Sequence, residues 1–125
     1  MTLADMKREI MFQTNTDMSD LGDFLPYLYG YINEGYDILV YIWKKEHVDP
    51  ANENWPPLAN DGDVPNLPQW AHRGLADYAT YLCYRNGNAA KQQRGLAYLQ
   101  NFERIRAQLA GEGDGKRRNF FNIPK

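Results

Sequence analysis

Four side chains in this 125-residue sequence are of types that serve as nucleophiles or general bases, namely Ser19, His47, His72 and Cys83. Ser19 is the only serine and lies on a polar connector, so a histidine would have to reach it from another segment. Cys83 and His72 are eleven residues apart on one predicted helix, a rise of about 16 Å that no hydrogen bond spans. We expect either Ser19 or Asp23 to cap the helix that follows, Cys83 to lie at the edge of the core, and the histidines to be partly exposed.

The spacing of the other polar residues predicts neither a metal site nor a phosphate site. The sequence has no Glu-x-x-His pair, and one cysteine cannot supply a zinc cluster. Residues 60–63 resemble a calcium loop, but a loop starting at Asp61 would put its glycine second rather than sixth and His72 in place of the bidentate glutamate. Residues 111–116 are one residue short of the phosphate-binding loop and lack its Ser or Thr. We expect no metal and no cofactor.

Two pairs of charged residues at helical spacing have simple structural explanations. Glu34 and Asp37 lie three residues apart on the polar side of a predicted helix, where a solvated face accounts for them without altered acidity. Arg73 and Asp77 are four residues apart, as in an ordinary helical ion pair. We therefore expect that the chain is not an enzyme, and a catalyst using His47, His72 or Cys83 is the weakest alternative.

Length and composition predict one soluble domain. The chain is long enough to bury one core, and its single cysteine excludes an intrachain disulfide. The longest apolar run, residues 38–43, is far short of the roughly 20 residues that a membrane helix needs, and no signal-peptide pattern opens the sequence. We expect a protein of a reducing cytoplasm with no membrane association.

Hydrophobic periodicity predicts four helices, at residues 2–13, 24–47, 66–86 and 88–110. Thr2 and Asp5 have the spacing of a helix N-cap and its acidic first turn. Residues 48–66 hold four of the seven prolines and are predicted to form a long loop that packs on its own domain. The sequence thus predicts an all-α, compact bundle of about four helices over residues 1–110, followed by a flexible, extended C-terminal arm over residues 111–125.

The segment 24–47 reads as the central helix of this bundle. Its apolar arc covers roughly 200°, about twice what contact with one neighbour requires. We interpret the excess as a mixture of packing inside the domain and contact with another subunit. Gly30 and Gly35 cost about 1 kcal/mol each in a helix interior, which favours close approach of another element, with a kink as the alternative.

The formal net charge of −2 hides an asymmetry between the two halves of the chain. Residues 1–64 hold twelve acidic and four basic residues, a net charge of −8. Residues 65–125 hold ten basic and four acidic residues, a net charge of +6. Either the halves neutralise each other within one fold, which we favour, or an acidic face of one copy meets a basic face of the next.

The C-terminal arm combines charge with apolar side chains. Gly111 is expected to end the last helix, and the glycines that follow form a linker. The arm then presents a basic triplet and three large apolar residues, which are Lys116, Arg117, Arg118, Phe120, Phe121 and Ile123. It is either a frayed terminus or a segment that docks on a partner or a neighbouring copy.

Nucleic-acid binding is the main alternative to subunit binding. The last two predicted helices, joined by the turn at residues 86–88, have a helix-turn-helix outline in the basic half of the chain. The basic residues of the second helix are spread around it: Arg94 and Arg104 lie on the polar side and Arg106 borders the apolar stripe. A recognition helix concentrates its contacts near its start, so this signal is weak.

Three stretches together resemble the small head-tail connector (adaptor) proteins of tailed phages and prophages. They are residues 2–10 (TLADMKREI), residues 24–43 with the centre YINEGY, and residues 70–78 (WAHRGLADY) continuing to Asn86-Gly87. The resemblance covers the four predicted helices and is one of layout, with no diagnostic active-site motif. The loop at residues 48–66 is a departure from the family pattern.

The resemblance implies a structural protein that assembles as a homo-oligomeric ring beneath the portal and joins head to tail. Its partners would be further copies of itself, the portal protein and a downstream stopper or tail-completion protein, with DNA passing through the channel without being read. It would be found in the cytoplasm of the bacterial host during assembly and then in the neck of the virion. A small helical DNA-binding or regulatory protein is the alternative.

We expect the subunit or portal interface to combine the aromatic side of the long helix, the loop and the arm. The residues assigned to it are Tyr29, Tyr36, Val40, Trp55, Lys116, Arg117, Arg118, Phe120, Phe121 and Ile123.

Overall fold

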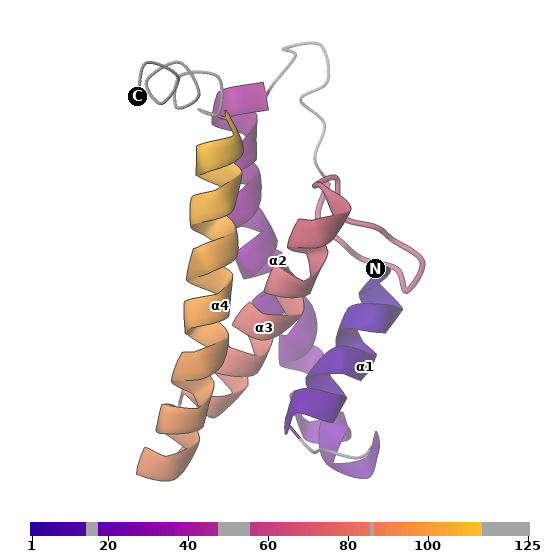
Figure 1. Ribbon diagram of the computed structural model, residues 1–125. Coiled ribbons are helices and arrows are strands. Elements are labelled where there is room, and N and C mark those ends of the chain that lie inside the picture. Colours follow the sequence, from indigo (N-terminus) through magenta and orange to yellow (C-terminus); the bar gives the residue numbers. More distant parts are fainter. Residues whose placement is uncertain (15–17, 48–55, 86, 114–125) are drawn as a thin grey trace.

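The computed structural model describes residues 1–14, 18–47, 56–85 and 87–113, with the backbone alone over residues 18–25, 44–47 and 112–113. In this part of the chain there are four α-helices, one 3₁₀ turn and no strand (Figure 1). The elements are α1 (Leu3–Thr14), α2 (Met18–His47), η2 (Gln69–Ala71), α3 (His72–Tyr84) and α4 (Ala89–Gly113). The predicted all-α compact bundle is confirmed.

The helix at the centre of the bundle is α3, not the longer α2. It packs against α1, α2 and α4, and α2 and α4 also pack on each other (Figure 1). Small buried residues such as Gly74, Ala76 and Ala79 let three helices approach it. A Cβ atom on Gly74 would lie only 3.0 Å from Cδ1 of Ile105 in α4. The prediction that residues 24–47 form the central helix was wrong, because a wide apolar arc shows that a helix has several neighbours but not where it lies.

A reciprocal cap begins α1. The backbone N–H of Asp5 donates to Oγ1 of Thr2 at 3.1 Å, and the N–H of Thr2 donates to Oδ2 of Asp5 at 2.9 Å. These bonds satisfy two donors that a helix start leaves unpaired. The helix then buries Leu3, Met6 and Ile10. The predicted cap and helix are confirmed.

The helix α2 begins at Met18, earlier than the expected start at Phe24. The polar residues before Phe24 read as turn formers, but Asp20 and Asp23 fall near the start of the helix, where the macrodipole favours negative charge. Pro26 lies inside the helix and lacks an N–H, so the helix lacks one backbone hydrogen bond there.

The two glycines of α2 have different surroundings. A Cβ atom on Gly35 would lie 3.1 Å from Cδ2 of Tyr78 in α3, so this position does serve the predicted close approach. A Cβ atom on Gly30 would meet nothing within 4 Å. The expectation of close packing therefore holds for Gly35 alone.

Residues 56–66 form no regular helix or strand and pack on the bundle, as predicted for this part of the loop. Leu58 is buried in the core. The side chain of Asn33 in α2 pairs with the Leu58 backbone, donating to its carbonyl at 2.9 Å and accepting from its N–H at 2.8 Å. The N–H of Leu3 donates to the carbonyl of Asp63 at 2.8 Å, which ties this segment to the start of α1 as well.

The helix α4 carries the expected apolar stripe, with Phe102, Ile105 and Leu109 buried. Its start is capped by Asn88, whose Oδ1 accepts from the N–H of Lys91 at 3.0 Å. The helix runs to Gly113, so the prediction that Gly111 ends it was wrong. Gly111 is buried within the helix, where glycine costs roughly 1 kcal/mol relative to alanine.

The glycines at the helix contacts make a direct test of this packing. We expect Gly95→Ala to lower the free energy of unfolding by about 1–3 kcal/mol, because its Cβ would lie 3.0 Å from Cβ of Tyr84 and the two helices would have to separate. We expect Gly30→Ala to raise it by about 0.4–1 kcal/mol, because the new methyl meets nothing and the unfolded chain loses freedom. Urea unfolding followed by circular dichroism measures both values, and equal effects of the two substitutions would contradict the packing.

Candidate protein interface

An aromatic strip runs along the outward side of α2. Its residues recur at alternating spacings of four and three, which place them on one side of a helix over about 21 Å of its axis. We call this strip the outer face of α2; it consists of Tyr27, Tyr31, Glu34, Ile38 and Tyr41. Tyr27 is 59% exposed and Tyr41 is 69% exposed, values far above those of aromatic core residues.

The side of α2 that faces the bundle is a separate set of residues. Leu28, Ile32 and Leu39 are fully buried against the other elements. Tyr31 and Ile38 of the outer face are partly buried and pack against the edge of this core, whereas Tyr27 and Tyr41 are exposed and do not belong to it. Its exposed tyrosines are large side chains with a polar tip, the type that is enriched at protein interfaces.

An open groove adjoins the outer face where α2 runs beside α4. It has a volume of about 460 Å³ and is lined by Asp37, Ile38, Tyr41 and Ile42 of α2 and by Arg106 of α4. We call it the α2–α4 groove. The Arg106 guanidinium donates to Glu103 of its own helix at 3.2 Å. The remaining lining is mostly apolar, which suits a hydrophobic side chain of a partner.

Acidic groups accompany the outer face and the groove. Glu34 accepts a hydrogen bond from the hydroxyl of Tyr78 at 3.2 Å, while Asp37 is exposed and makes no ion pair with any described residue. Burial raises the pKa of Tyr36, and the neighbouring Asp37 carboxylate adds to the rise. This side of α2 thus combines aromatic surface with negative charge.

Two of the predicted interface residues belong to the core instead. Tyr36 is 2% exposed, and its hydroxyl accepts from the N–H of Asn66 at 2.9 Å. Val40 is 9% exposed and belongs to the same hydrophobic cluster. Neither side chain is available to another subunit in this conformation. For Tyr36 the helical wheel could not predict this burial, because it depends on the contact with the loop at residues 56–66.

Tyr29 is half-buried and lies under α1 rather than on the outer face. Its hydroxyl accepts from Nζ of Lys7 at 2.8 Å, and the same ammonium lies 4.6 Å from the ring centroid. The other predicted interface residues lie outside the described residues; they are Trp55, Lys116, Arg117, Arg118, Phe120, Phe121 and Ile123. Of the ten predicted residues, the structure therefore places three, and none of them on the outer face.

Sequence reasoning missed Tyr27, Ile38 and Tyr41. A signal for them was present, since the spacing of four and three is that of a seam between two packed helices. It was missed because Tyr27, Ile38 and Tyr41 fall just outside the apolar arc of the helical wheel, on the side counted as polar. Counting two separate stripes on a 30-residue helix would have identified it.

A buried carboxyl group joins α1, α3 and α4. Asp77 is 1% exposed; its Oδ1 accepts from Nε2 of Gln13 at 2.8 Å, and its Oδ2 accepts from the amide of Asn101. Burial raises the pKa of Asp77. The predicted ion pair with Arg73 was wrong, because Arg73 instead reaches across to Glu9 of α1 at 2.6 Å. With amide partners and no opening to solvent, Asp77 acts as a structural link between helices.

His72 and Cys83 are held as structural side chains. His72 is 4% exposed, which corrects the expectation of partial exposure; Nε2 lies 2.9 Å from the Leu67 carbonyl and Nδ1 lies 2.9 Å from the Met1 amino nitrogen. Burial lowers the pKa of His72. Cys83 is half-buried, and burial raises the pKa of its thiol to about 11, so it is protonated at neutral pH. Ser19 and Asp23 lie inside α2, which begins at Met18, so the prediction that one of them caps this helix was wrong. The side chains of Ser19 and His47 lie outside the described residues.

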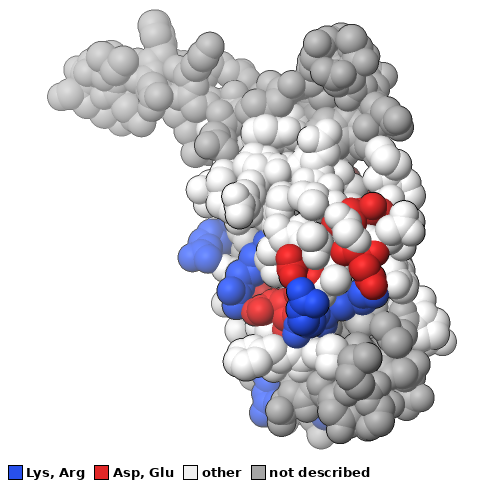
Figure 2. All heavy atoms as spheres, turned by 90° about the vertical axis from the view of Figure 1, so that its right-hand side faces the viewer, with Lys and Arg blue, Asp and Glu red and all other residues white. Residues whose placement is uncertain are grey.

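Charges of both signs mix on the side of the molecule that carries α1. Figure 2 shows Lys and Arg interleaved with Asp and Glu in one band of this face. The pairs include Lys7 with Asp61 at 2.6 Å and Arg73 with Glu9 at 2.6 Å. The second pair joins the acidic half of the chain to the basic half. On this face the favoured interpretation, neutralisation within one fold, is the one that the structure supports.

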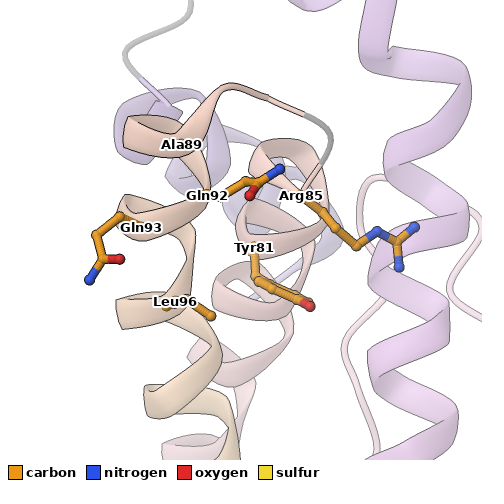
Figure 3. A pocket seen from close by; sticks show the side chains of 6 residues that line it. All are labelled: Tyr81, Arg85, Ala89, Gln92, Gln93 and Leu96. Atoms are coloured by element: carbon orange, nitrogen blue, oxygen red, sulfur yellow. The ribbon is translucent and has the colours of Figure 1, made fainter.

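Positive charge prevails where α3 ends and α4 begins. No acidic residue occurs between Asp77 and Glu103, whereas Arg85, Lys91 and Arg94 are exposed. A shallow pocket of about 420 Å³ lies here; α3 contributes Tyr81, Arg85 directly follows α3, and the other lining residues come from α4 (Figure 3). The side chains that Figure 3 labels do not converge on one point.

No family model, no curated protein and no solved structure matches this chain. Among the residues that the structure describes, no group of three or more His, Cys, Asp or Glu is placed to hold a metal ion. No helix over the described ranges is both long and apolar enough to cross a membrane.

The environment of His72 predicts how stability depends on pH. Its pKa in the folded protein lies below the ordinary value of 6.5, so its contribution is complete above pH 6.5 and declines as the pH falls toward the folded pKa. We expect the free energy of unfolding to fall as the pH decreases below 6.5, by at most about 1.4 kcal/mol per pH unit from this group. Urea unfolding of His72→Gln should show a flatter profile, and an unchanged slope would contradict the assignment.

Proposed function

We propose that this protein is a structural subunit of a phage head-tail connector, which forms a ring under the portal and joins head to tail through protein interfaces. The observation that carries the proposal is the outer face of α2, where Tyr27 and Tyr41 stand in solvent while the core of the protomer is already complete without them. Large exposed aromatic side chains along one helix face are typical of surfaces that a partner covers.

The architecture supports this proposal in a second way. A ring grows by head-to-tail contacts, in which each copy offers two different surfaces that complement each other. The outer face of α2 is aromatic and acidic, whereas Arg85 at the end of α3 and Lys91 and Arg94 in the first turns of α4 are exposed and have no acidic residue nearby in sequence. The all-α fold agrees with what the family resemblance implies. The C-terminal arm, with its basic triplet and apolar residues, would reach an adjacent subunit or the portal.

The proposal predicts that the outer face is needed for assembly and not for folding. We expect Tyr27→Ser combined with Tyr41→Ser to weaken ring formation or portal binding at least tenfold while leaving the melting temperature within a few degrees, because neither side chain contributes to the core. Light scattering and negative-stain electron microscopy of the protein, alone and with the portal, measure the effect. Phe12→Ser is the matched control, since Phe12 is 83% exposed on α1, away from the outer face.

Two outcomes would contradict the proposal. One is a wild-type protein that neither forms rings nor binds the portal. The other is a double variant that assembles as well as the wild type does.

The second candidate is a small DNA-binding protein, which the acid-free stretch from α3 into α4 favours. If Arg85, Lys91 and Arg94 contact phosphates, duplex DNA should be retarded in a gel, and affinity should fall steeply as salt rises. Replacing all three with Gln should abolish binding. A connector should show weak binding that does not depend on DNA sequence, so sequence-specific retardation would favour the DNA-binding function over the connector.

A further inference from the structure

The α2–α4 groove lies within reach of the chain's own C-terminal arm. The helices α2 and α4 run side by side and end at the same end of the bundle (Figure 1). Arg106 lines the groove and lies seven residues before Gly113, the last residue of α4. Along the helix axis, the groove is therefore about 10 Å from the end of α4. Eight further residues, from Gly113 to Phe121, span up to about 26 Å when extended.

The sequence after Gly113 permits the chain to turn back. Gly115 follows within two residues, and glycine adopts the backbone conformations that a sharp reversal needs. The basic triplet 116–118 comes next, and Phe120, Phe121 and Ile123 follow it. An arm that reverses after α4 therefore brings first positive charge and then apolar side chains to the groove.

Charge and apolar surface in the groove complement this segment. The groove itself is lined by one acidic and one basic residue, Asp37 and Arg106. Arg106 is paired with Glu103 at 3.2 Å, whereas Asp37 makes no ion pair with any described residue, and Glu34 adds a second carboxylate on the adjoining outer face. Ile38, Tyr41 and Ile42 supply the apolar lining. A second copy presenting the same outer face would fit less well, because Glu34 lies in the middle of the strip and would face another Glu34.

The short connection favours contact within one copy. A segment tethered by a few residues has an effective concentration in the millimolar range, far above that of a separate molecule in a dilute solution. We propose that in the unassembled protein residues 116–123 dock in the α2–α4 groove of the same copy. This goes beyond the proposed function, since it concerns the protein before assembly: the arm would cover part of the surface that a partner later occupies.

Disulfide trapping in the full-length chain tests this contact. In a Cys83→Ala background, one variant carries Tyr41→Cys with Phe121→Cys, and a matched control carries Phe12→Cys with Phe121→Cys. The Phe12 side chain is 83% exposed, so a cysteine there is accessible, but it lies on α1 and not in the groove. Mild oxidation is followed by non-reducing electrophoresis and mass spectrometry, after circular dichroism has shown that both variants are folded.

We expect the groove pair to form an intramolecular disulfide at least ten times faster than the control pair, and Asp37→Lys to slow that reaction. Equal rates for the two pairs, or a product that is a cross-linked dimer, would overturn the inference. The dimer would place the arm on another copy. If the disulfide test fails but the wild type still forms rings or binds the portal, the proposed function stands. Failure of the arm contact is therefore distinguishable from failure of the proposed function.

Discussion

Close packing around α3 is the constraint on which the rest of the structure depends. Small residues such as Gly74 and Ala79 allow α1, α2 and α4 to contact this helix together. The buried Asp77 then ties α1 and α4 to it through Gln13 and Asn101. If one of these hydrogen bonds is lost, a buried polar group is left without a partner, which is costly. The network therefore fixes the positions of the three helices relative to one another.

This arrangement determines which part of α2 remains for a partner. Because α3, α4 and residues 56–66 cover the inner side of α2, its core residues are fully buried. The helix is long enough to carry a second stripe, whose tyrosines Tyr27 and Tyr41 have no place in that core. The candidate interface is therefore a consequence of the packing: one side of a long helix is used within the protomer, and the other presents aromatic surface and negative charge.

Local features could be predicted from the sequence, and features that depend on tertiary contact could not. The cap at Thr2 and the apolar stripe of α4 follow from spacing along the chain, and both were predicted. Whether Tyr36 lies in the core or on a surface depends on a loop that folds over it from 30 residues away, as its bond to Asn66 shows. Likewise, Arg73 forms its ion pair with Glu9, which is distant in sequence, and not with the nearby Asp77.

Mass-spectrometric footprinting of tyrosines tests the central claim most directly, because it reads the two sides of α2 in one experiment. In the free protein we predict that Tyr27, which lies outside the α2–α4 groove, reacts readily with hydroxyl radicals while the buried Tyr36 does not. In the presence of the portal, or in assembled rings, we predict that Tyr27 becomes protected. A Tyr27 that stays equally reactive in the assembly, or a Tyr36 that reacts as fast as Tyr27 in the free protein, would contradict the account.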